Sequence, residues 1–209
     1  LNIDGMGGYA SDENGGSFTF DNIPEDDIYT LSATVVDKAG NQTEQSIEFS
    51  VNRDGSTYSL DEETESLNGS YVASAKNVVI REVNPDELIE HKLTLFKNDK
   101  TVALTEGSDY SVDVSGGNGQ WYQYVYTVYS KNFEDDGVYR LTVHSVDKAG
   151  NIAENVIDGK DKEITFGVDA TAPNIIMMNL ESGTTYPTDN LEAAMAVSDN
   201  LKLNSVEVY

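Results

Sequence analysis

The chain has 209 residues and carries 37 aspartates and glutamates against 13 lysines and arginines, which gives a formal charge of −24 at pH 7. This charge excludes nucleic acid as a partner, because a polyanion is repelled by it, and it disfavours anionic membrane surfaces. Cysteine is absent, so disulfides, thiolate nucleophiles and cysteine-based zinc sites are excluded. The apolar runs are far shorter than the roughly 20 residues that cross a bilayer, so direct membrane insertion is not expected.

A repeat with an offset of 110 residues organises the sequence. Residues 28–41 read IYTLSATVVDKAGN, and residues 138–151 read VYRLTVHSVDKAGN. An alternating segment follows each copy and ends at Asn52 or at Asp169, an offset of 117, so an insertion of seven residues is expected near 157–162. Apolar and polar residues alternate with period two, which predicts strands, and the shared pentapeptide DKAGN predicts a turn.

The predicted elements are nearly all short strands. In chain order they are expected at 70–73, 77–83, 92–97, 110–115, 120–130, 138–146 and 164–168, followed by 174–180, 191–198 and 205–209. The best helical candidate is a single turn at 85–90. Seven short strands over about 115 residues are typical of an immunoglobulin-type β-sandwich. A tyrosine early in the penultimate strand, Tyr29 in the first copy and Tyr139 in the second, suits the tyrosine corner of that fold.

The repeat also divides the chain into units. Residues 53–169 are expected to form one complete immunoglobulin-like domain, residues 1–52 the C-terminal part of a preceding one, and residues 170–209 a linker and the N-terminal part of a third. Pro173 stiffens the linker after the complete domain, because proline fixes its backbone φ angle. No proline stands at 52–55, so the first junction is expected to bend more than the second.

At this point the residues resemble a known family. The pattern Gly-x-Tyr-x-Leu-x-Val, then Asp-x-Ala-Gly-Asn, then Phe-x-Val-Asp-x-x-x-Pro-x-Ile is similar to the tandem bacterial immunoglobulin-like repeats of large, adhesin-type cell-surface proteins. The residues that carry it are Gly137, Tyr139, Leu141, Val143, Asp147, Ala149, Gly150, Asn151, Phe166, Val168, Asp169, Pro173 and Ile175.

The resemblance implies an all-β chain of tandem immunoglobulin-like β-sandwiches. It also implies a non-catalytic, structural or adhesive segment of a secreted bacterial protein, at the cell surface or cell wall, that spaces or presents a binding region. The partner would be a protein or a glycan on a cell surface.

The sequence offers no catalytic residues. Its two histidines, His91 and His144, have no metal-binding spacing, and no Gly-x-Ser-x-Gly motif is present. Paired carboxylates carry no signal for glycoside hydrolysis in so acidic a chain. The protein is therefore expected not to be an enzyme.

Calcium is the one cofactor that the residues suggest, and none is required. Hard cations take several oxygen ligands, usually carboxylates and carbonyls from loops. Candidate ligands are Asp37, Asn41, Asn52, Asp54, Asp147, Asn151 and Asp169, and Asp199 and Asn200 lie in a similar loop. An ion at a junction would neutralise charge and stiffen the rod. The alternative is that these side chains only bond the backbone of their own turns.

An aromatic strand at 121–129 offers a second candidate site. Its face with Tyr122, Tyr124 and Tyr126 is expected to be the core face, which leaves Trp121 and Tyr129 on the other. Exposed aromatics can stack on sugar rings or on a partner protein, and this favours an alternative function, a carbohydrate-binding accessory module of a secreted polysaccharide-degrading enzyme. Ordinary cross-strand pairing of these side chains is the competing explanation.

The two partial domains each lack half of a sandwich. Neither can bury a two-sheet core alone, because each leaves an apolar face and strand edges exposed. One hypothesis is head-to-tail self-association, with residues 205–209 of one chain near residues 1–4 of the next. The alternative is that the sequence is a piece of a longer protein, which agrees with Leu1 not being an initiator methionine.

Overall fold

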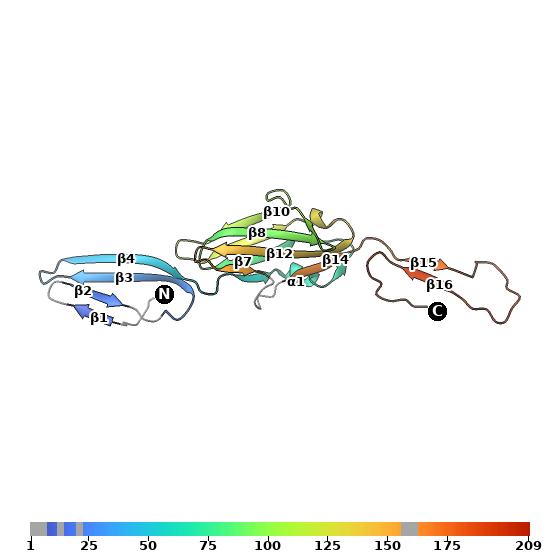
Figure 1. The fold of residues 1–209 in the computed structure, drawn as a ribbon, viewed down its shortest axis with the longest axis horizontal. Coiled ribbons are helices and arrows are strands. Elements are labelled where there is room, and N and C mark those ends of the chain that lie inside the picture. The colour runs from blue at the N-terminus through green and yellow to red at the C-terminus, as the bar shows by residue number, and fades with distance from the viewer. Residues whose placement is uncertain (1–7, 12–14, 20–22, 156–162) are drawn as a thin grey trace.

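The computed structural model describes residues 8–11, 15–19, 23–155 and 163–209. The insertion expected near 157–162 lies outside these residues. Three parts follow one another along the long axis of the molecule: an N-terminal part of two hairpins, a central sandwich and a C-terminal hairpin (Figure 1). No helix in the described part of the chain is long and apolar enough to span a membrane.

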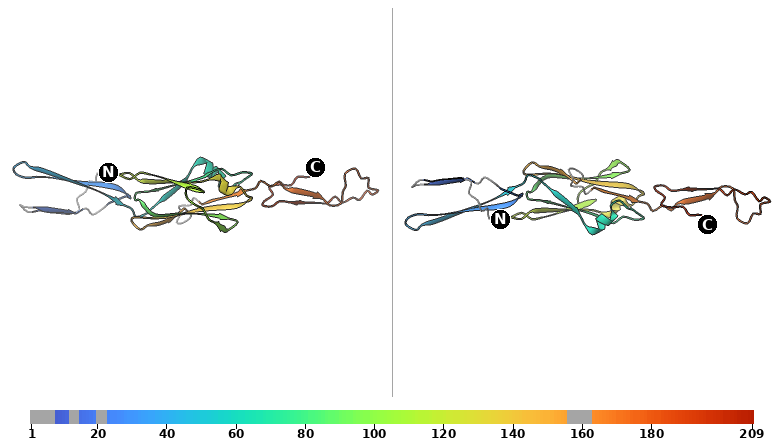
Figure 2. Two further views of the ribbon diagram at one scale, coloured as in Figure 1. Left: turned by 90° about the horizontal axis from the view of Figure 1, so that it is seen from above. Right: turned by 90° about the horizontal axis from the view of Figure 1, so that it is seen from below.

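Two antiparallel hairpins form the N-terminal part. They are β1 (Gly8–Ser11) with β2 (Gly16–Thr19), and β3 (Asp27–Val36) with β4 (Gln42–Val51). The predicted turn at 37–41 joins β3 to β4, and Gly40 takes a φ of 89° there, a left-handed conformation that favours glycine. The two hairpins lie in separate layers (Figure 2).

Two sheets form the central part. Their strands are β5 (Thr57–Leu60), β6 (Tyr71–Val72), β7 (Val78–Asn84), β8 (Leu88–Lys97), β9 (Lys100–Val102), β10 (Tyr110–Ser115), β11 (Tyr122–Val128), β12 (Gly137–Asp147), β13 (Ile152–Glu154) and β14 (Ile164–Val168). One sheet has the order β10-β11-β7-β5, and the other has the order β6-β14-β12-β8-β9, with β13 paired to β12. By the immunoglobulin convention, the first is the D-E-B-A sheet and the second contains strands G, F and C. The prediction of an all-β immunoglobulin-like sandwich is confirmed.

Alternation along the strands places one face of each sheet in a shared core. In β12 every second residue, from Gly137 to Asp147, is buried, as the period of a strand requires. The predicted inward face of β11 is confirmed, because Tyr124, Tyr126 and Val128 are buried.

A carboxylate lies inside this core. Glu82 of β7 is fully buried and accepts three hydroxyl groups. Tyr126 donates to Oε2 at 2.7 Å, Tyr58 donates to Oε1 at 3.1 Å, and Ser145 also donates to Oε1. Burial and the nearby Glu82 carboxylate raise the pKa of both tyrosine hydroxyls, so these groups stay protonated and donate. The bonds compensate for the removal of the carboxylate from water.

Both copies of the repeat contain a tyrosine corner. Tyr29 donates its hydroxyl to the Glu25 carbonyl at 2.7 Å, and Tyr139 donates to the Asp135 carbonyl at 2.7 Å. The Tyr139 ring also stacks on Phe166, with 5.7 Å between the ring centroids. The corner predicted from the recurring tyrosine is therefore present in each copy.

The helical turn predicted at 85–90 is wrong. Residues 85 and 86 form a bend, and Leu88 already begins β8. The Leu88 N–H donates to the Tyr124 hydroxyl at 2.8 Å, and β8 pairs with β12 along its length. Strand pairing and the core contact therefore outweigh the weak local preference of this segment.

The helix lies earlier in the chain, as α1 (Glu62–Leu67). Asp61 is its N-cap and accepts the Thr64 N–H at 2.8 Å, which satisfies one of the free donors of the first turn. A short 3-10 helix, η1 (Ser130–Phe133), follows β11.

The C-terminal part is a single hairpin of β15 (Asn174–Met177) and β16 (Met195–Ser198). The strands predicted at 174–180 and 191–198 form in shorter versions. The strand predicted at 205–209 is wrong, because these residues are described and form none. A strand requires a partner backbone, and β15 and β16 pair only with each other among the described strands.

Candidate functional site

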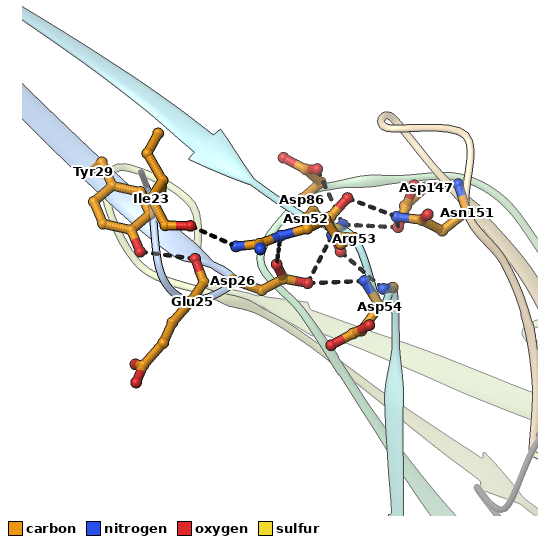
Figure 3. Close-up of polar contacts among 11 residues, drawn as sticks. Ile23, Glu25, Asp26, Tyr29, Asn52, Arg53, Asp54, Asp86, Asp147 and Asn151 are labelled. Carbon is orange, nitrogen blue, oxygen red and sulfur yellow. Dashed lines mark hydrogen bonds and ion pairs between the residues drawn. The ribbon is translucent and has the colours of Figure 1, made fainter. Parts of the chain in front are cut away.

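The first junction is held by a carboxylate clamp, formed by Asp26 and the backbone of Arg53 and Asp54. Asp26 Oδ2 accepts the N–H of Arg53 at 2.7 Å and that of Asp54 at 2.8 Å (Figure 3). The Arg53 guanidinium donates to Asp26 Oδ1 at 2.9 Å and to the Ile23 carbonyl at 3.0 Å. Desolvation raises the pKa of Asp26, but the hydrogen bonds and the guanidinium lower it below its usual value. The clamp ties the start of β3 to the residues after β4.

The end of β4 is also bound at the 147–151 turn of the central part. Asp147 is buried, and its Oδ2 accepts the side-chain amides of Asn52, Asn84 and Asn151 at 2.8, 3.1 and 3.1 Å. The Asn151 amide also donates to the Asn52 carbonyl at 3.1 Å (Figure 3). Desolvation raises the pKa of Asp147, and the amide bonds outweigh it, so the pKa lies below its usual value. The buried carboxylate of Asp147 in the central part thus binds Asn52, the residue that follows β4 of the N-terminal part.

Further contacts cross the first junction. The Trp121 indole N–H donates to Asp27 Oδ1 at 2.8 Å, and the Ser50 hydroxyl donates to Asp86. Beside them lies a groove of about 160 Å³, whose lining includes Glu48, Phe49, Asp86, Glu87, Asn118 and Lys148.

The second junction repeats the clamp at the positions one repeat further on. Asp136, which corresponds to Asp26, accepts the Ala170 N–H at 2.7 Å and the Thr171 hydroxyl. The Asn200 amide of the C-terminal part donates to Asp136 Oδ2 at 2.7 Å. A cation–π contact adds to these bonds, with Lys202 Nζ 5.5 Å from the centroid of the Tyr71 ring. The same device therefore joins both pairs of neighbouring units.

The junctions differ at the residue that directly follows the last strand of the preceding unit. Asn52 donates to carboxylates at the first junction, whereas the second has Asp169 in that position. Burial raises the pKa of Asp169, and the nearby carboxylates of Asp199 and Asp136 raise it further. Like charges therefore oppose each other at the second junction.

The predicted calcium ligands lie in three places. In the exposed 37–41 turn, the Asn41 amide donates to Asp37 Oδ2 at 2.7 Å and its N–H donates to Oδ1 at 2.8 Å. The first junction brings together Asn52, Asp54, Asp147 and Asn151 (Figure 3), and the second contains Asp169. Within the described ranges, no group of three or more His, Cys, Asp or Glu side chains is arranged to hold a metal ion. Calcium binding stays a prediction.

The two aromatic residues predicted to bind a ligand stand at opposite ends of β11. Trp121 precedes the strand and bonds Asp27 across the first junction. Tyr129 follows the strand, where its N–H donates to the Asp109 carbonyl at 3.0 Å. The structure therefore assigns one of them to a contact between units and does not place the pair side by side.

The two partial units lie at opposite ends of the molecule (Figure 1). Residues 1–4, which the head-to-tail hypothesis places near residues 205–209, lie outside the described residues, and association between chains stays a prediction.

Sequence reasoning missed the residues that form the clamps. Asp26 and Asp136 were available as a signal, because an acidic cluster recurs before each copy, at 25–27 and at 134–136. Asn84, which donates to Asp147, carries no comparable signal, because its partner is distant in the sequence.

Comparison with known proteins supports the fold at family level. Residues 5–53 match the family model of a bacterial Ig-like domain. One similar solved structure is the crystal structure of the Down Syndrome Cell Adhesion Molecule (DSCAM) isoform 1.30.30, N-terminal eight Ig domains, at 17% identity and a TM-score of 0.25. The alignment covers 71% of this chain and only 17% of that one. No curated protein matches the sequence.

The strand order of the central part and the family match of the N-terminal part both indicate Ig-like units. Bacterial Ig-like domains are commonly found in extracellular proteins, and Ig-like families are generally non-catalytic, with structural or adhesive roles. Residues 5–53 are thus similar to a bacterial Ig-like domain, and the central part has the strand order of an Ig-like sandwich.

Proposed function

We propose that this chain is a spacer segment of a bacterial surface protein. It holds successive Ig-like units in a fixed direction and so presents a binding region away from the cell. The observation that carries the proposal is the repeated clamp. Asp26 and Asp136 occupy equivalent positions, and each binds the backbone just after the last strand of its own unit.

The clamps support spacing because they restrict the linker. A short linker bends when its backbone φ and ψ angles are free, and hydrogen bonds to two consecutive residues remove that freedom. At the first junction, which lacks proline, Arg53 and Asn52 add side-chain bonds. At the second, Pro173 limits the backbone directly. Each junction thus has its own means of limiting bending.

The acidic surface supports a place at the cell surface or cell wall. A formal charge of −24 keeps neighbouring chains apart by self-repulsion and maintains solubility where molecules are crowded. A protein or glycan partner would then bind the presented region.

The alternative, a carbohydrate-binding accessory module, has less support, because the Trp121 indole N–H is engaged by Asp27. Binding of the chain to a glycan array, with loss of binding in Trp121→Ala, would favour this alternative over the spacer.

Small-angle X-ray scattering of clamp variants tests the spacer. Asp26→Ala and Asp136→Ala each remove one clamp, and Asp113→Ala is the control, because Asp113 is an exposed residue of β10 away from both junctions. We expect both clamp variants to show a broader distribution of interatomic distances than the parent, and the control to match the parent. Scattering profiles that coincide for all four proteins would contradict a role of the clamps in spacing.

A further inference from the structure

The chain contains two described Asn-Gly dipeptides in contrasting surroundings, Asn68–Gly69 and Asn118–Gly119. In such a dipeptide the glycine backbone nitrogen can attack the asparagine side-chain carbonyl carbon, because no Cβ on the next residue hinders the approach. The product is a five-membered succinimide ring. Whether the reaction proceeds in a folded protein depends on how firmly the amide and the attacking nitrogen are held.

Asn68 is held on every side. Its side-chain amide donates to the Glu163 carbonyl at 2.8 Å, and its Oδ1 accepts the Thr165 N–H at 2.8 Å. The attacking nitrogen, Gly69 N, donates to the Thr165 carbonyl at 2.7 Å. Attack at Asn68 would therefore break three hydrogen bonds.

Asn118 is free by comparison. It is exposed at the tip of the loop between β10 and β11, with a φ of 52°, and Gly119 follows with a φ of 82°. The turn is closed by bonds between Gly117 and Gln120, at 3.0 and 3.3 Å. Within the described part of the chain, neither the Asn118 side chain nor the Gly119 N–H has a hydrogen-bond partner. Both residues are exposed to water, and no hydrogen bond within the described ranges holds either reacting group in place.

We propose that Asn118 is a site of spontaneous succinimide formation and that its conversion to a carboxylate loosens the first junction. The Gly119 nitrogen forms a bond to Asn118 Cγ, the bond from Cγ to Nδ2 breaks, and the Gly119 N–H proton leaves with the nitrogen as ammonia. Water then opens the ring at either carbonyl, which gives aspartate or isoaspartate. Water is the only co-reactant, and no change of oxidation state occurs.

The new charge arises against an acidic surface of the preceding unit. A Cβ built on Gly119 would lie 2.8 Å from Glu48 Oε2, so the loop contacts β4 closely. Asn118 lines the same groove as Glu48, Asp86 and Glu87. The groove's one lysine, Lys148, is already paired with Glu87 at 2.5 Å. An added carboxylate is therefore repelled, and the isoaspartate form also lengthens the turn by one backbone atom.

Peptide mapping by mass spectrometry after prolonged incubation of the chain at mildly alkaline pH tests the modification. We expect conversion at Asn118 to exceed that at Asn68 in the same sample by about tenfold or more, a ratio that corresponds to a difference of ~1.4 kcal/mol in activation free energy. Equal conversion at the two sites, or none at Asn118, would overturn the proposal.

The single tryptophan reports the consequence for the junction, because Trp121 lies next to this loop and bonds Asp27. We expect its emission to shift to longer wavelength during ageing of the parent, and Asn118→Asp to show that shift from the start. Asn118→Gly keeps a residue that tolerates positive φ and should show no shift with age. The shift should shrink at high salt, where exposed charges are screened. Conversion of Asn118 without any change in Trp121 emission would overturn the effect on the junction.

Discussion

One oxygen atom of Asp147 accepts three side-chain amides, and this distinguishes it from its exposed counterpart Asp37. Both residues begin the same DKAGN turn, and both bond the asparagine four positions later. Only Asp147 also binds Asn52 and Asn84, and only Asp147 is buried. The same DKAGN turn is therefore expected to contribute differently to the free energy of unfolding in the two copies.

Asp147→Asn should lower the free energy of unfolding by about 2 kcal/mol, because neutral amides replace charge-assisted bonds and one donor faces another. Asp37→Asn is the matched control, and it should change stability much less, since water can bond the groups of the exposed turn. Denaturant unfolding at neutral pH measures both. An equal effect of the two substitutions would contradict the role of Asp147 at the junction.

The tyrosine corner of the central sandwich allows a second test. Tyr139→Phe removes the bond to the Asp135 carbonyl and should cost about 1 kcal/mol. Tyr139→Ala also leaves a cavity beside Phe133 and Phe166 and should cost about 3 kcal/mol or more. Thermal melts check the order of the three proteins. A Tyr139→Ala protein that melts with the parent would show that this ring does not support the core.

Residues whose partners are local could be predicted from the sequence, and those with distant partners could not. The turn bonds of Asp37 and the corner of Tyr29 follow from neighbours within four positions. The bond from Asn52 to Asp147 spans 95 positions. The sequence repeat places both residues near a junction, but it does not predict that they contact each other.

At the scale of the elements, β7 combines a regular pattern with an exceptional residue. Its alternation puts Val78, Ile80, Glu82 and Asn84 on the buried face. Period two alone therefore predicts a carboxylate in the core, a signal that the sequence contains. The three hydroxyls that make this burial tolerable come from β5, β11 and β12, which only the fold brings together.

Glu82→Ala should lower the free energy of unfolding by about 3 to 5 kcal/mol, because three buried hydroxyls lose their acceptor and a cavity forms. Glu82→Gln keeps one oxygen and the side-chain volume, so it should cost clearly less. Chemical denaturation separates the two, provided that the slope with denaturant is unchanged. Equal losses for both variants would contradict this account, because Gln keeps the volume and one acceptor oxygen, which Ala lacks.

The two elements that the sequence misjudged, the turn at 85–90 and the strand at 205–209, fail for related physical reasons. The first has local helical preference but joins a sheet through long-range pairing with β12. The second has strand alternation but no neighbouring backbone to pair with among the described strands. In both cases the presence of a partner strand decides whether the segment forms a strand. The periodicity of a single sequence does not reveal that partner.

At the scale of the whole molecule, two carboxyl groups of the second junction, Asp136 and Asp169, should respond to pH with opposite signs. The pKa of Asp136 is lowered, most by the Thr171 hydroxyl, from the ordinary 3.8, so its contribution is present above that value and is lost as the pH falls through the folded-state pKa. The pKa of Asp169 is raised, so its ionised form opposes the folded junction above that raised value, and protonation on acidification relieves it.

Asp169→Asn should therefore raise the melting temperature at neutral pH, and the difference from the parent should close as the pH falls below the raised pKa. Asp136→Asn is the control of opposite sign, with a lower melting temperature than the parent at neutral pH. Melts across an acidic pH series measure both. A neutral-pH melting temperature of Asp169→Asn at or below that of the parent would contradict repulsion at this junction.

Calcium provides the last test at this scale. An ion that binds only the folded chain raises the melting temperature by mass action, so added Ca²⁺ should stabilise the protein relative to chelator if the predicted residues bind it. Asp147→Asn and Asp169→Asn would then reduce the shift. Thermal melts that superimpose with Ca²⁺ and with chelator would contradict calcium binding at the junctions.

The 147–151 turn receives the strand end of the preceding unit, and the matching turn at 37–41 carries the same internal bonds. Each repeat thus has a turn that can bind the preceding unit and a last strand that leads into the following unit, so the connection runs in one direction along the chain. Because the repeat returns after 110 residues, gain or loss of one whole repeat would keep a carboxylate clamp at the new boundary. Recombination between copies can therefore change the length of such a protein without the evolution of a new interface.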